Sequence, residues 1–493
     1  MMNFPILSWM IFIPLIGAML ILCTPKGMEK TIKGLALVFS FIPLFLAGMV
    51  YANFNPAISQ LQFVEKILWI PIFNIHYSVG LDGISISIFL LTALLTFLSV
   101  LISCNITKRV KEYFMLFLVL EVGMLGVFVA MDLFLFYIFW EVVLIPMYFL
   151  IGVWGGPRRR YAAIKFVLYT VAGSLIMLIG ILCVYFTSNP HTMDILELSK
   201  TCTFAREFQN IMFFLFFIGF AVKVPIWPFH TWLPDAHTEA PTAASVILAG
   251  ILLKMGVYGF LRISFPIFPE AAIYFAYPFA VLGVINIIYG ALTAMAQNDL
   301  KKMIAYSSIS HMGFCLIAMS ALTVTGINGA VVQMFTHGAV TGSLFMLVGV
   351  IYDRAHTRNI DEFSGLWQKM PIYTGLMMLA VLASLGLPGL AGFIGEFVCL
   401  MGTFVSTFPG FKLIAILSTS GVVITAVYLL WMMERVFWKG LNPKWEHLTD
   451  INKRELLAII PILIVIILIG ICPDLLVNLM NVSTIQMVKG IMP

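Results

Sequence analysis

Six ionisable residues lie inside strongly apolar segments of this sequence. They are Glu141, Lys223, Lys254, His311, His337 and Glu396. A charged side chain at the centre of a lipid-embedded helix costs about 2.5–3.5 kcal/mol on insertion scales, so such residues normally face a polar interior and serve an ion path. Because carboxylates, amines and imidazoles can all hold and release a proton, the set indicates a proton relay inside the membrane.

Other interpretations of these residues stay open on the sequence alone. Glu141 and Lys223 could form a static ion pair between two helices, and each histidine could cap a neighbouring helix. Transfer is favoured because Lys254 has no acid on its own helix and Glu396 has no intramembrane lysine beside it. Histidine also titrates near neutral pH. Movement of Glu141 relative to Lys223 would then switch whether the lysine holds its proton, because a nearby opposite charge favours the charged form.

Several further polar residues have no assigned role. Glu121 also lies deep in an apolar segment, and His230 and His237 lie in a polar loop that we expect near the mouth of the path. A zinc site made by these two histidines with Asp235 and Glu239 matches no standard spacing, so none is predicted. The seven cysteines show no C-x-x-C spacing and are expected to be packing residues; they are Cys23, Cys104, Cys183, Cys202, Cys315, Cys399 and Cys472.

The elements that carry these residues must be membrane-spanning helices. The chain has 493 residues, of which 61% are hydrophobic and 10% are charged, so lipid is its main solvent. A spanning helix needs roughly 20 apolar residues, and ten-residue alternating strand patterns are absent, which predicts an all-α bundle of about fourteen helices. The apolar windows lie near residues 4–22, 35–52, 83–104, 114–130, 133–153, 163–186, 209–228, 242–263, 271–295, 303–321, 329–351, 373–404, 413–437 and 456–479.

The loops between these windows alternate in charge. Twenty of the 28 lysines and arginines fall in every second loop, at positions 26, 30, 33, 108, 109, 111, 158, 159, 160, 165, 301, 302, 354, 358, 369, 435, 439, 444, 453 and 454. By the positive-inside rule these loops face the cytoplasm or the matrix, which leaves both termini on the outer side. Since the basic residues form no continuous tract, nucleic acid is not an expected partner. Asp82, Asp132 and Asp299 are expected to be interfacial caps.

Two of the predicted spans are interrupted beside an ionisable residue. Lys223 is followed by Pro225 and Pro228, and the proline- and glycine-rich stretch LPGLAG closely precedes Glu396. Proline removes a helical hydrogen bond and clashes with the preceding turn, so the helix should break near Lys223. Paired interrupted spans are typical of transporters built from repeats.

The two breaks lie five helices apart, so their segments cross the membrane in opposite directions and any repeat that relates them is inverted. The predicted organisation has four parts: a three-helix segment at residues 1–110, a five-helix unit at 111–264, a second and inverted five-helix unit at 265–440, and a C-terminal transmembrane helix at 441–493.

Five long and specific stretches span most of the chain. They are GLDGIS (80–85), FWEVVLIPMY (139–148), AVKVPIWPFHTWLPDAHTEAPTAASVILAGILLKMGVYGFLR (221–262), QNDLKKMIAYSSISHMG (297–313) and LPGLAGFIGEF (387–397). At these residues the sequence resembles one known family, the antiporter-like subunits of respiratory complex I (NADH:quinone oxidoreductase), and within it the M type, called subunit four in mitochondria. Glu396 favours the M type, because the related L and N chains usually have a lysine there.

The resemblance implies fourteen helices with two inverted five-helix units, and proton translocation driven by quinone reduction in a distant arm. It also implies a role for each buried ionisable residue. Carried over by motif, the modulating glutamate, its paired lysine, the central lysine, the two connecting histidines and the terminal acid that exchanges with the outer side are Glu141, Lys223, Lys254, His311, His337 and Glu396.

The resemblance implies partners as well. The sequence has no nucleotide-binding glycine loop and no cysteine cluster, so no cofactor or metal is expected in this chain. Complex I implies NADH, FMN, iron–sulfur clusters and a quinone in partner subunits, with L-type and N-type chains on either side in the lipid bilayer. A bacterial plasma membrane is the preferred location and a mitochondrial inner membrane is the alternative. The rival functions are a D-type subunit of a multisubunit cation/proton antiporter and a structural chain that pumps nothing.

Overall fold

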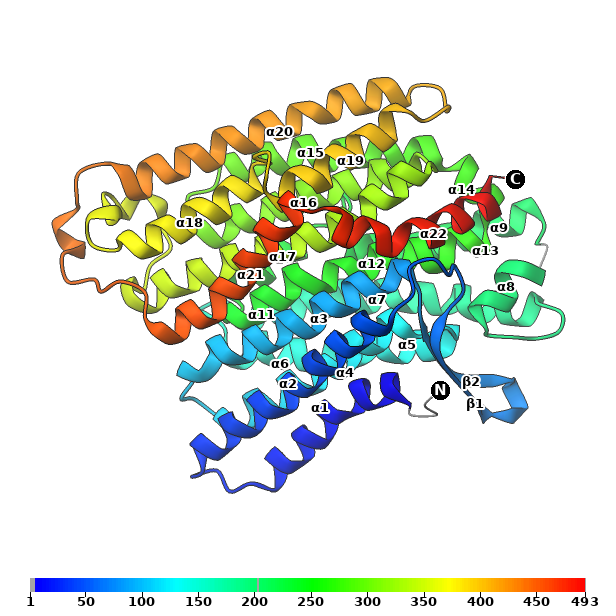
Figure 1. The fold of residues 1–493 in the computed structure, drawn as a ribbon, viewed down its shortest axis with the longest axis horizontal. Helices are drawn as coiled ribbons and strands as arrows, with labels where there is room; N and C mark the ends of the chain where they lie inside the picture. The colour runs from blue at the N-terminus through cyan, green and yellow to red at the C-terminus, as the bar shows by residue number, and fades with distance from the viewer. Residues whose placement is uncertain (1–4, 202–203, 493) are drawn as a thin grey trace.

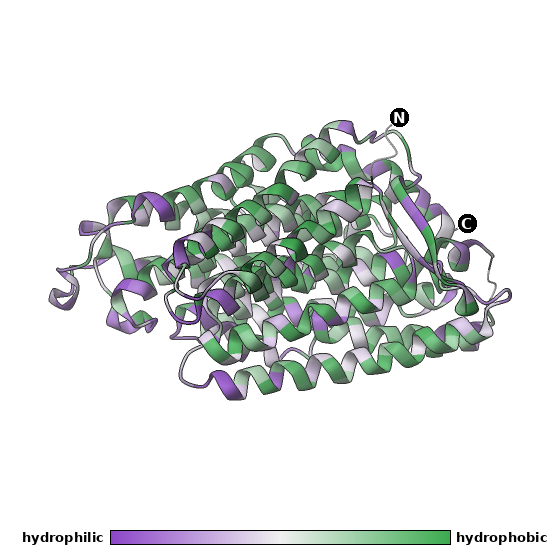
Figure 2. Ribbon diagram, turned by 90° about the horizontal axis from the view of Figure 1, so that it is seen from below, coloured by the Kyte–Doolittle hydropathy of each residue, from purple (hydrophilic) through white to green (hydrophobic). Residues whose placement is uncertain are grey.

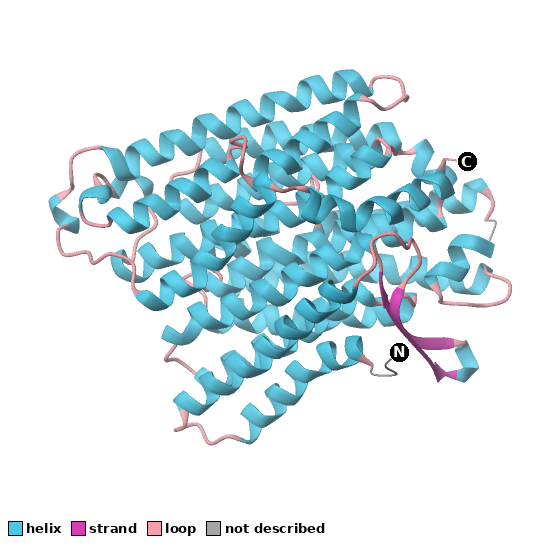
Figure 3. Ribbon diagram, viewed as in Figure 1, coloured by secondary structure: helices cyan, strands magenta, loops and turns pink. Residues whose placement is uncertain are grey.

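The computed structural model describes residues 5–201 and 204–492 and is a bundle of long helices with one small sheet (Figure 1, Figure 3). In this part of the chain, 12 helices are long and apolar enough to cross a membrane, by length and composition. Hydrophobic residues cover most of the helices, and hydrophilic residues gather at the ends and in the loops (Figure 2). The predicted all-α membrane architecture is therefore confirmed. The count of fourteen, which adds the two interrupted spans, stays a prediction.

The N-terminal part contains three long helices and a β-hairpin. The hairpin strands pair antiparallel, with Glu65 opposite Val79. Asp82 ends the hairpin and caps α3, where its side chain accepts hydrogen bonds from the backbone N–H groups of Ile84 and Ser85, as an N-cap residue should. The elements are α1 (Ile6–Cys23), α2 (Glu29–Asn53), β1 (Gln62–Ile70), the 3₁₀ turn η1 (Pro71–Phe73), β2 (Ile75–Leu81), α3 (Gly83–Ile102) and the 3₁₀ turn η2 (Ser103–Asn105).

The first central group runs from residue 110 to residue 267. Two turns within its last span are π-helical, and they flank a short α-helical stretch that carries Lys254. The elements are α4 (Val110–Val129), α5 (Leu133–Val142), α6 (Leu144–Trp154), α7 (Arg159–Thr187), α8 (Ile195–Thr201), α9 (Arg206–Lys223), α10 (Trp232–Glu239), α11 (Thr242–Ile247), π-helical η3 (Leu248–Leu252), α12 (Leu253–Gly259), π-helical η4 (Phe260–Ser264) and α13 (Phe265–Ile267).

The second central group and the C-terminal part follow. The predicted window 373–404 is two helices, because the chain leaves the helix at Leu385 and resumes it at Ala391. The elements are α14 (Pro269–Tyr274), α15 (Ala276–Met295), α16 (Leu300–Ser320), α17 (Val324–Ala355), the 3₁₀ turns η5 (Ile360–Glu362) and η6 (Leu366–Gln368), α18 (Pro371–Ser384), α19 (Ala391–Phe404), α20 (Phe411–Met433), π-helical η7 (Glu434–Trp438), the 3₁₀ turn η8 (Pro443–Trp445), α21 (Lys453–Ile471) and α22 (Asp474–Ile491).

The predicted last span at 456–479 is wrong in its bounds. The helix α21 ends at Ile471, and α22 begins at Asp474 after Pro473. Proline cannot continue a helical hydrogen-bond ladder, which explains the division. The new helix packs against α3 and α17, and the side chain of Ser483 accepts a hydrogen bond from the backbone of Gly83.

Aspartates begin one helix in each central group, as predicted. Asp132 accepts hydrogen bonds from two backbone N–H groups at the start of α5, and Asp299 does the same at the start of α16. Each aspartate also forms an isolated β-bridge to a later loop, Asp132 with Asp194 and Asp299 with Asn359. The two groups therefore repeat the same local construction at corresponding points of the chain.

Candidate functional site

Four of the six predicted residues lie next to one another as a series of buried polar groups, with a gap between the two imidazoles. The Lys254 Nζ atom lies 2.7 Å from Nδ1 of His337, and the rings of His337 and His311 lie 5.4 Å apart between centroids. Nδ1 of His311 then lies 2.8 Å from a carboxylate oxygen of Glu396. Lys254 is fully buried, and the other three side chains are only 4% exposed. The structure thus joins residues that are as much as 142 positions apart in the sequence.

A small cavity lies where the two histidines and Glu396 meet. Its volume is about 10 Å³, and it is also lined by the polar side chains of Gln333, Thr336 and Ser384. A cavity of roughly 10–15 Å³ is the least that holds one water molecule. Because Ser384 also lies 3.5 Å from Nε2 of His311, the junction is polar on several sides.

Helix geometry holds the Lys254 side chain in place. The lysine follows the π-helical turn η3, and its ammonium donates to the backbone carbonyl of Ala249 within that turn at 2.5 Å. A π-helical turn widens the backbone ring, and such turns occur frequently at functional sites. The helix α17, which carries His337, packs against η3. Gly338 allows that close approach, since a Cβ atom there would lie 2.7 Å from the carbonyl oxygen of Gly250.

The other two predicted residues do not form the expected pair. No ion pair within 4.0 Å joins Glu141 to Lys223 among the described residues. The ammonium of Lys223 is buried without a hydrogen-bond partner and lies 5.1 Å from the centre of the Trp140 ring, a cation–π contact. Glu141 lines an apolar groove of about 630 Å³ instead. A static clamp is therefore not the arrangement in this structure.

The helix break beside Lys223 is stabilised by side chains from elsewhere. The Asn286 amide accepts from the backbone N–H of Trp227 at 2.8 Å and donates to the carbonyl of Pro225 at 3.2 Å. The indole of Trp232 donates to the carbonyl of Val222 at 2.9 Å. Backbone groups freed by a break inside a membrane must be satisfied within the protein, and these contacts do so.

Lys223 and the chain of four are neighbours without a polar link. The helix α12 packs on α9 through Gly256, where an added Cβ would meet Val224 and the carbonyl of Phe220. No hydrogen bond joins Lys223 to Lys254 in residues 5–201 and 204–492. The predicted relay residues from Lys254 to Glu396 therefore lie close together, whereas apolar packing separates Lys223 from Lys254. That they form a proton path stays a prediction.

The structure places His237 deeper in the bundle than the sequence analysis predicts. It was predicted at the mouth, but it is fully buried in α10 and stacks on Phe345 of α17, with ring centroids 4.6 Å apart. Neither ring nitrogen has a hydrogen-bond partner, and the charges of Lys301 and Lys254 both act on it. His237 therefore lies on a helix that packs against both α7 and α16.

That end of α16 opens onto a cavity of about 200 Å³, lined by Glu239, Lys301, Asp353 and Arg358 among others. Lys301 was counted among the loop charges, yet it is 2% exposed and donates to the carbonyl of Ala240 at 2.7 Å. The cavity brings several charges together on the side of the molecule with the basic loops, which we call the basic face.

The other polar residues singled out in the sequence either form ion pairs near the basic face or lie buried without a partner. Of the four residues weighed as zinc ligands, Asp235 pairs with Lys165 at 2.7 Å and Glu239 faces Arg158 at 3.8 Å. Glu121 is fully buried, and neither carboxylate oxygen has a hydrogen-bond partner. Cys202 lies outside the described residues, and the other six cysteines are free thiols.

A buried ion pair closes the opposite end of the Lys254 helix. The Arg262 guanidinium lies 2.6 Å from the Asp82 carboxylate and donates to the Tyr258 hydroxyl at 3.0 Å. Burial raises the pKa of the Asp82 carboxyl, but the charge and hydrogen bond of Arg262, with hydrogen bonds from Ser85, lower that pKa below its ordinary value. The pair ties α3 to η4 at a fixed distance from Lys254.

Comparison with known proteins shows the family of this chain. Residues 130–425 match the family described as NADH:quinone oxidoreductase/Mrp antiporter, TM. The chain belongs to this family. It is 42% identical to NADH-quinone oxidoreductase subunit M of Rhodobacter capsulatus, over 98% of this chain and 96% of that protein. It is 41% identical to NADH-ubiquinone oxidoreductase chain 4 of Marchantia polymorpha, over 98% and 97% respectively.

Solved structures agree with this family. A chain in the structure of respiratory complex I from Thermus thermophilus with bound NADH matches with a TM-score of 0.90 and 29% identity, covering 99% of this chain and 100% of that one. A chain in the Mrp complex from Dietzia sp. DQ12-45-1b matches with a TM-score of 0.83 over 97% of this chain and 51% of that one, but at 21% identity it shows the fold alone. The predicted M-type, antiporter-like family is confirmed.

Proposed function

We propose that this chain is a membrane-arm subunit of NADH:quinone oxidoreductase that translocates protons, coupled to quinone reduction elsewhere in the complex. The observation that carries the proposal is the buried contact series Lys254, His337, His311 and Glu396. Every member can take up or release a proton, and the four residues lie on four separate helices, α12, α17, α16 and α19. The identity to relatives named subunit M and chain 4 supports the assignment to this complex.

In this proposal protons enter from the basic face. They pass from the cavity beside Lys301 to His237 and then to Lys254, where the ammonium can donate along its 2.7 Å contact to His337. A water molecule in the small cavity would connect the two imidazoles. His311 would then pass the proton to Glu396, which acts as the terminal acid toward the other side of the membrane.

Lys223 and Glu141 would control this path by charge. The ammonium of Lys223 has no hydrogen-bond partner, and Glu141 is the charged group that acts on it. A change in the separation of these two groups alters the potential at Lys254 without any direct contact, because Coulomb interactions in a low-dielectric interior reach further than in water. The groove beside Glu141 is where we expect a neighbouring L-type or N-type chain to carry such a change.

The proposal includes two inverted five-helix units. The matching aspartate caps and bridges at Asp132 and Asp299 support this relation, as do the π-helical turns η4 and η7, which lie near or at the end of the last helix of each unit. The redox chemistry of NADH, FMN, iron–sulfur clusters and quinone belongs to partner chains in this proposal. We place the chain in a bacterial plasma membrane with both termini outside.

The proposal is tested in native membranes with the single variants Lys223→Ala, Glu141→Ala and Glu396→Ala. Matched controls are Lys26→Ala and Glu446→Ala, both at exposed positions. Once a native gel shows that the complex assembles, we expect quinone reduction and proton pumping to fall together in the three variants and not in the controls. Loss of sodium or proton exchange with intact quinone reduction would instead favour a D-type antiporter subunit. Unchanged activities would favour a purely structural chain.

A further inference from the structure

An apolar groove on the surface of the bundle lies between α2, α3 and α21. Its volume is about 520 Å³. The lining side chains are Leu37, Val38, Phe41, Ile42 and Leu44 of α2, Leu94, Phe97, Leu98 and Leu101 of α3, and Leu457 and Pro461 of α21. The groove runs along α2 for the eight residues from Leu37 to Leu44, which is about 12 Å at 1.5 Å per residue. That length is close to one leaflet of a hydrocarbon core about 30 Å thick.

Basic residues stand at one end of this groove. Lys33 lies one turn before Leu37 on α2, and Arg454 lies one turn before Leu457 on α21. Cys104 follows Leu101 by three residues, and its thiol is acted on by the charges of both Lys33 and Arg454. The two cations therefore stand on different helices next to the same end of the groove, where Arg454 also lines the neighbouring cavity of about 200 Å³ beside Lys301. This end lies on the basic face.

These two cations are not neutralised within the chain. Neither Lys33 nor Arg454 forms an ion pair within 4.0 Å in the described part of the chain, and the Nε atom of Arg454 is buried without a hydrogen-bond partner. The carboxylate beside Arg454 in sequence is already engaged, because Glu455 accepts hydrogen bonds from Arg354 at 2.8 and 3.0 Å.

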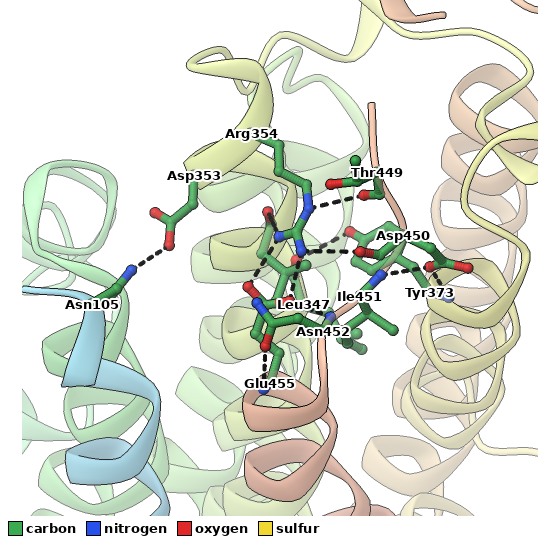
Figure 4. Close-up of polar contacts among 11 residues, drawn as sticks. Asn105, Leu347, Asp353, Arg354, Tyr373, Thr449, Asp450, Ile451, Asn452 and Glu455 are labelled. Carbon is green, nitrogen blue, oxygen red and sulfur yellow. Dashed lines mark hydrogen bonds and ion pairs between the residues drawn. The ribbon is translucent and has the colours of Figure 1, made fainter. Parts of the chain in front are cut away.

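The surrounding contacts fix this arrangement. Figure 4 shows Arg354 joining Glu455 to the carbonyls of Thr449 and Asp450, which fastens the start of α21 to the end of α17. Asp353 lies near enough for its charge to act on Arg454, but it accepts a hydrogen bond from Asn105 at 2.7 Å and also faces Lys301 and Arg354. Positive charge is therefore in excess at the mouth of the groove.

We propose that the groove between α2, α3 and α21 binds one anionic phospholipid, with an acyl chain along the groove and its phosphate held by Lys33 and Arg454. Charge complementarity favours this occupant, since one molecule of an anionic phospholipid supplies both an acyl chain for the apolar walls and an anion for the two cations. Basic pockets between membrane helices on the cytoplasmic or matrix side are suited to anionic head groups. The lipid would also brace α21 against the N-terminal helices.

The test uses the purified, delipidated complex and native mass spectrometry. The complex is incubated with phosphatidylglycerol or with phosphatidylcholine that has the same acyl chains, and the retained lipids are counted. The charge variant is Lys33→Gln with Arg454→Gln, and its matched control is Lys26→Gln with Lys439→Gln, which removes two exposed cations of the basic face. At about 1 kcal/mol for each basic contact, the charge variant should bind phosphatidylglycerol about thirty-fold more weakly at this site.

A second variant tests the groove without a change of charge. Val38 is 53% exposed and lines the groove, so Val38→Trp should obstruct the acyl chain and lower binding of phosphatidylglycerol, whereas Val423→Trp on the exposed side of α20 should not. Equal retention of the two lipids by the wild type would overturn the proposal. So would a charge variant that binds like its control, a Val38→Trp complex that binds like the wild type, or a groove occupied by a polypeptide.

Discussion

The central step of the proposed relay can be broken at His337 with little change in packing. His337→Gln keeps an amide oxygen that can accept from the Lys254 ammonium, now 2.7 Å from Nδ1, but glutamine cannot carry a proton. The imidazoles of His311 and His337 are 5.4 Å apart between centroids, so His311 then has no titratable partner on the side of Lys254.

The expected size of the effect follows from the chemistry that is lost. A positioned acid or base contributes about 10²–10⁴-fold to a proton transfer, which is roughly 2.7–5.4 kcal/mol of barrier. We therefore expect proton pumping, and with it coupled quinone reduction, to fall at least tenfold in His337→Gln. His337→Ala should also reduce assembly, because Lys254 loses one of its two partners and a buried donor without a partner costs about 1–3 kcal/mol.

The assay compares NADH-driven quinone reduction and proton uptake in native membranes, normalised to assembled complex on a native gel. His447→Gln is the matched control, because His447 lies at an exposed position outside the bundle. If His337→Gln pumped within twofold of the wild type, the route from Lys254 to His311 would be wrong, whatever the other variants did.

Three further predictions concern the scaffold. Asn286→Ala should lower the free energy of unfolding by about 1–3 kcal/mol, because the amide makes hydrogen bonds to the backbone of Pro225 and Trp227 at the helix break. An unchanged melting temperature of the complex would refute this. Gly338→Ala should cost about 1–3 kcal/mol through overpacking against Gly250 and reduce pumping beside Lys254, whereas Gly375→Ala, with open space around it, should be neutral. Asp82→Asn should cost about 3–5 kcal/mol by leaving Arg262 buried and unpaired. Because the folded pKa of Asp82 is lowered, its stabilising contribution is present above the ordinary carboxyl pKa and is lost as the pH falls through the folded value, so a pH-stability profile of the wild type should decline in acid more than that of the variant.

The sequence predicted which ionisable residues are buried in the bundle better than it predicted their contacts. Burial cost singles out an ionisable residue in an apolar window from the sequence alone, which is why Lys254 and Glu396 were found. Which of the buried ionisable residues contact one another depends on how α12, α16, α17 and α19 pack. This packing cannot be derived from the spacing of residues in the sequence. Glu141 and Lys223 were therefore paired by charge, whereas the structure gives Lys223 the Trp140 ring as its neighbour.

The misses in the fold have similar causes. The strand β1 alternates weakly in burial, so the hairpin gives little periodic signal. His237 was judged by the prolines and polar residues around it, although α10 folds back into the bundle and buries it against Phe345. Pro473 lies just after the end of α21. Apolar residues lie on both sides of it, so the predicted window at 456–479 ran through the break.

The two helix breaks lie close to opposite charges. Lys223 is the last residue of α9, and Glu396 lies in the second turn of α19. The carbonyl end of a helix favours a cation by about 0.3–1 kcal/mol at exposed sites and more when buried, and the effect falls off within the last turn. The break after Lys223 thus offsets part of the cost of its charge, because an unbroken helix would supply no such field in the middle of the membrane. Glu396 lies beyond the first turn of its helix, so its charge depends instead on the contact between its carboxylate and Nδ1 of His311.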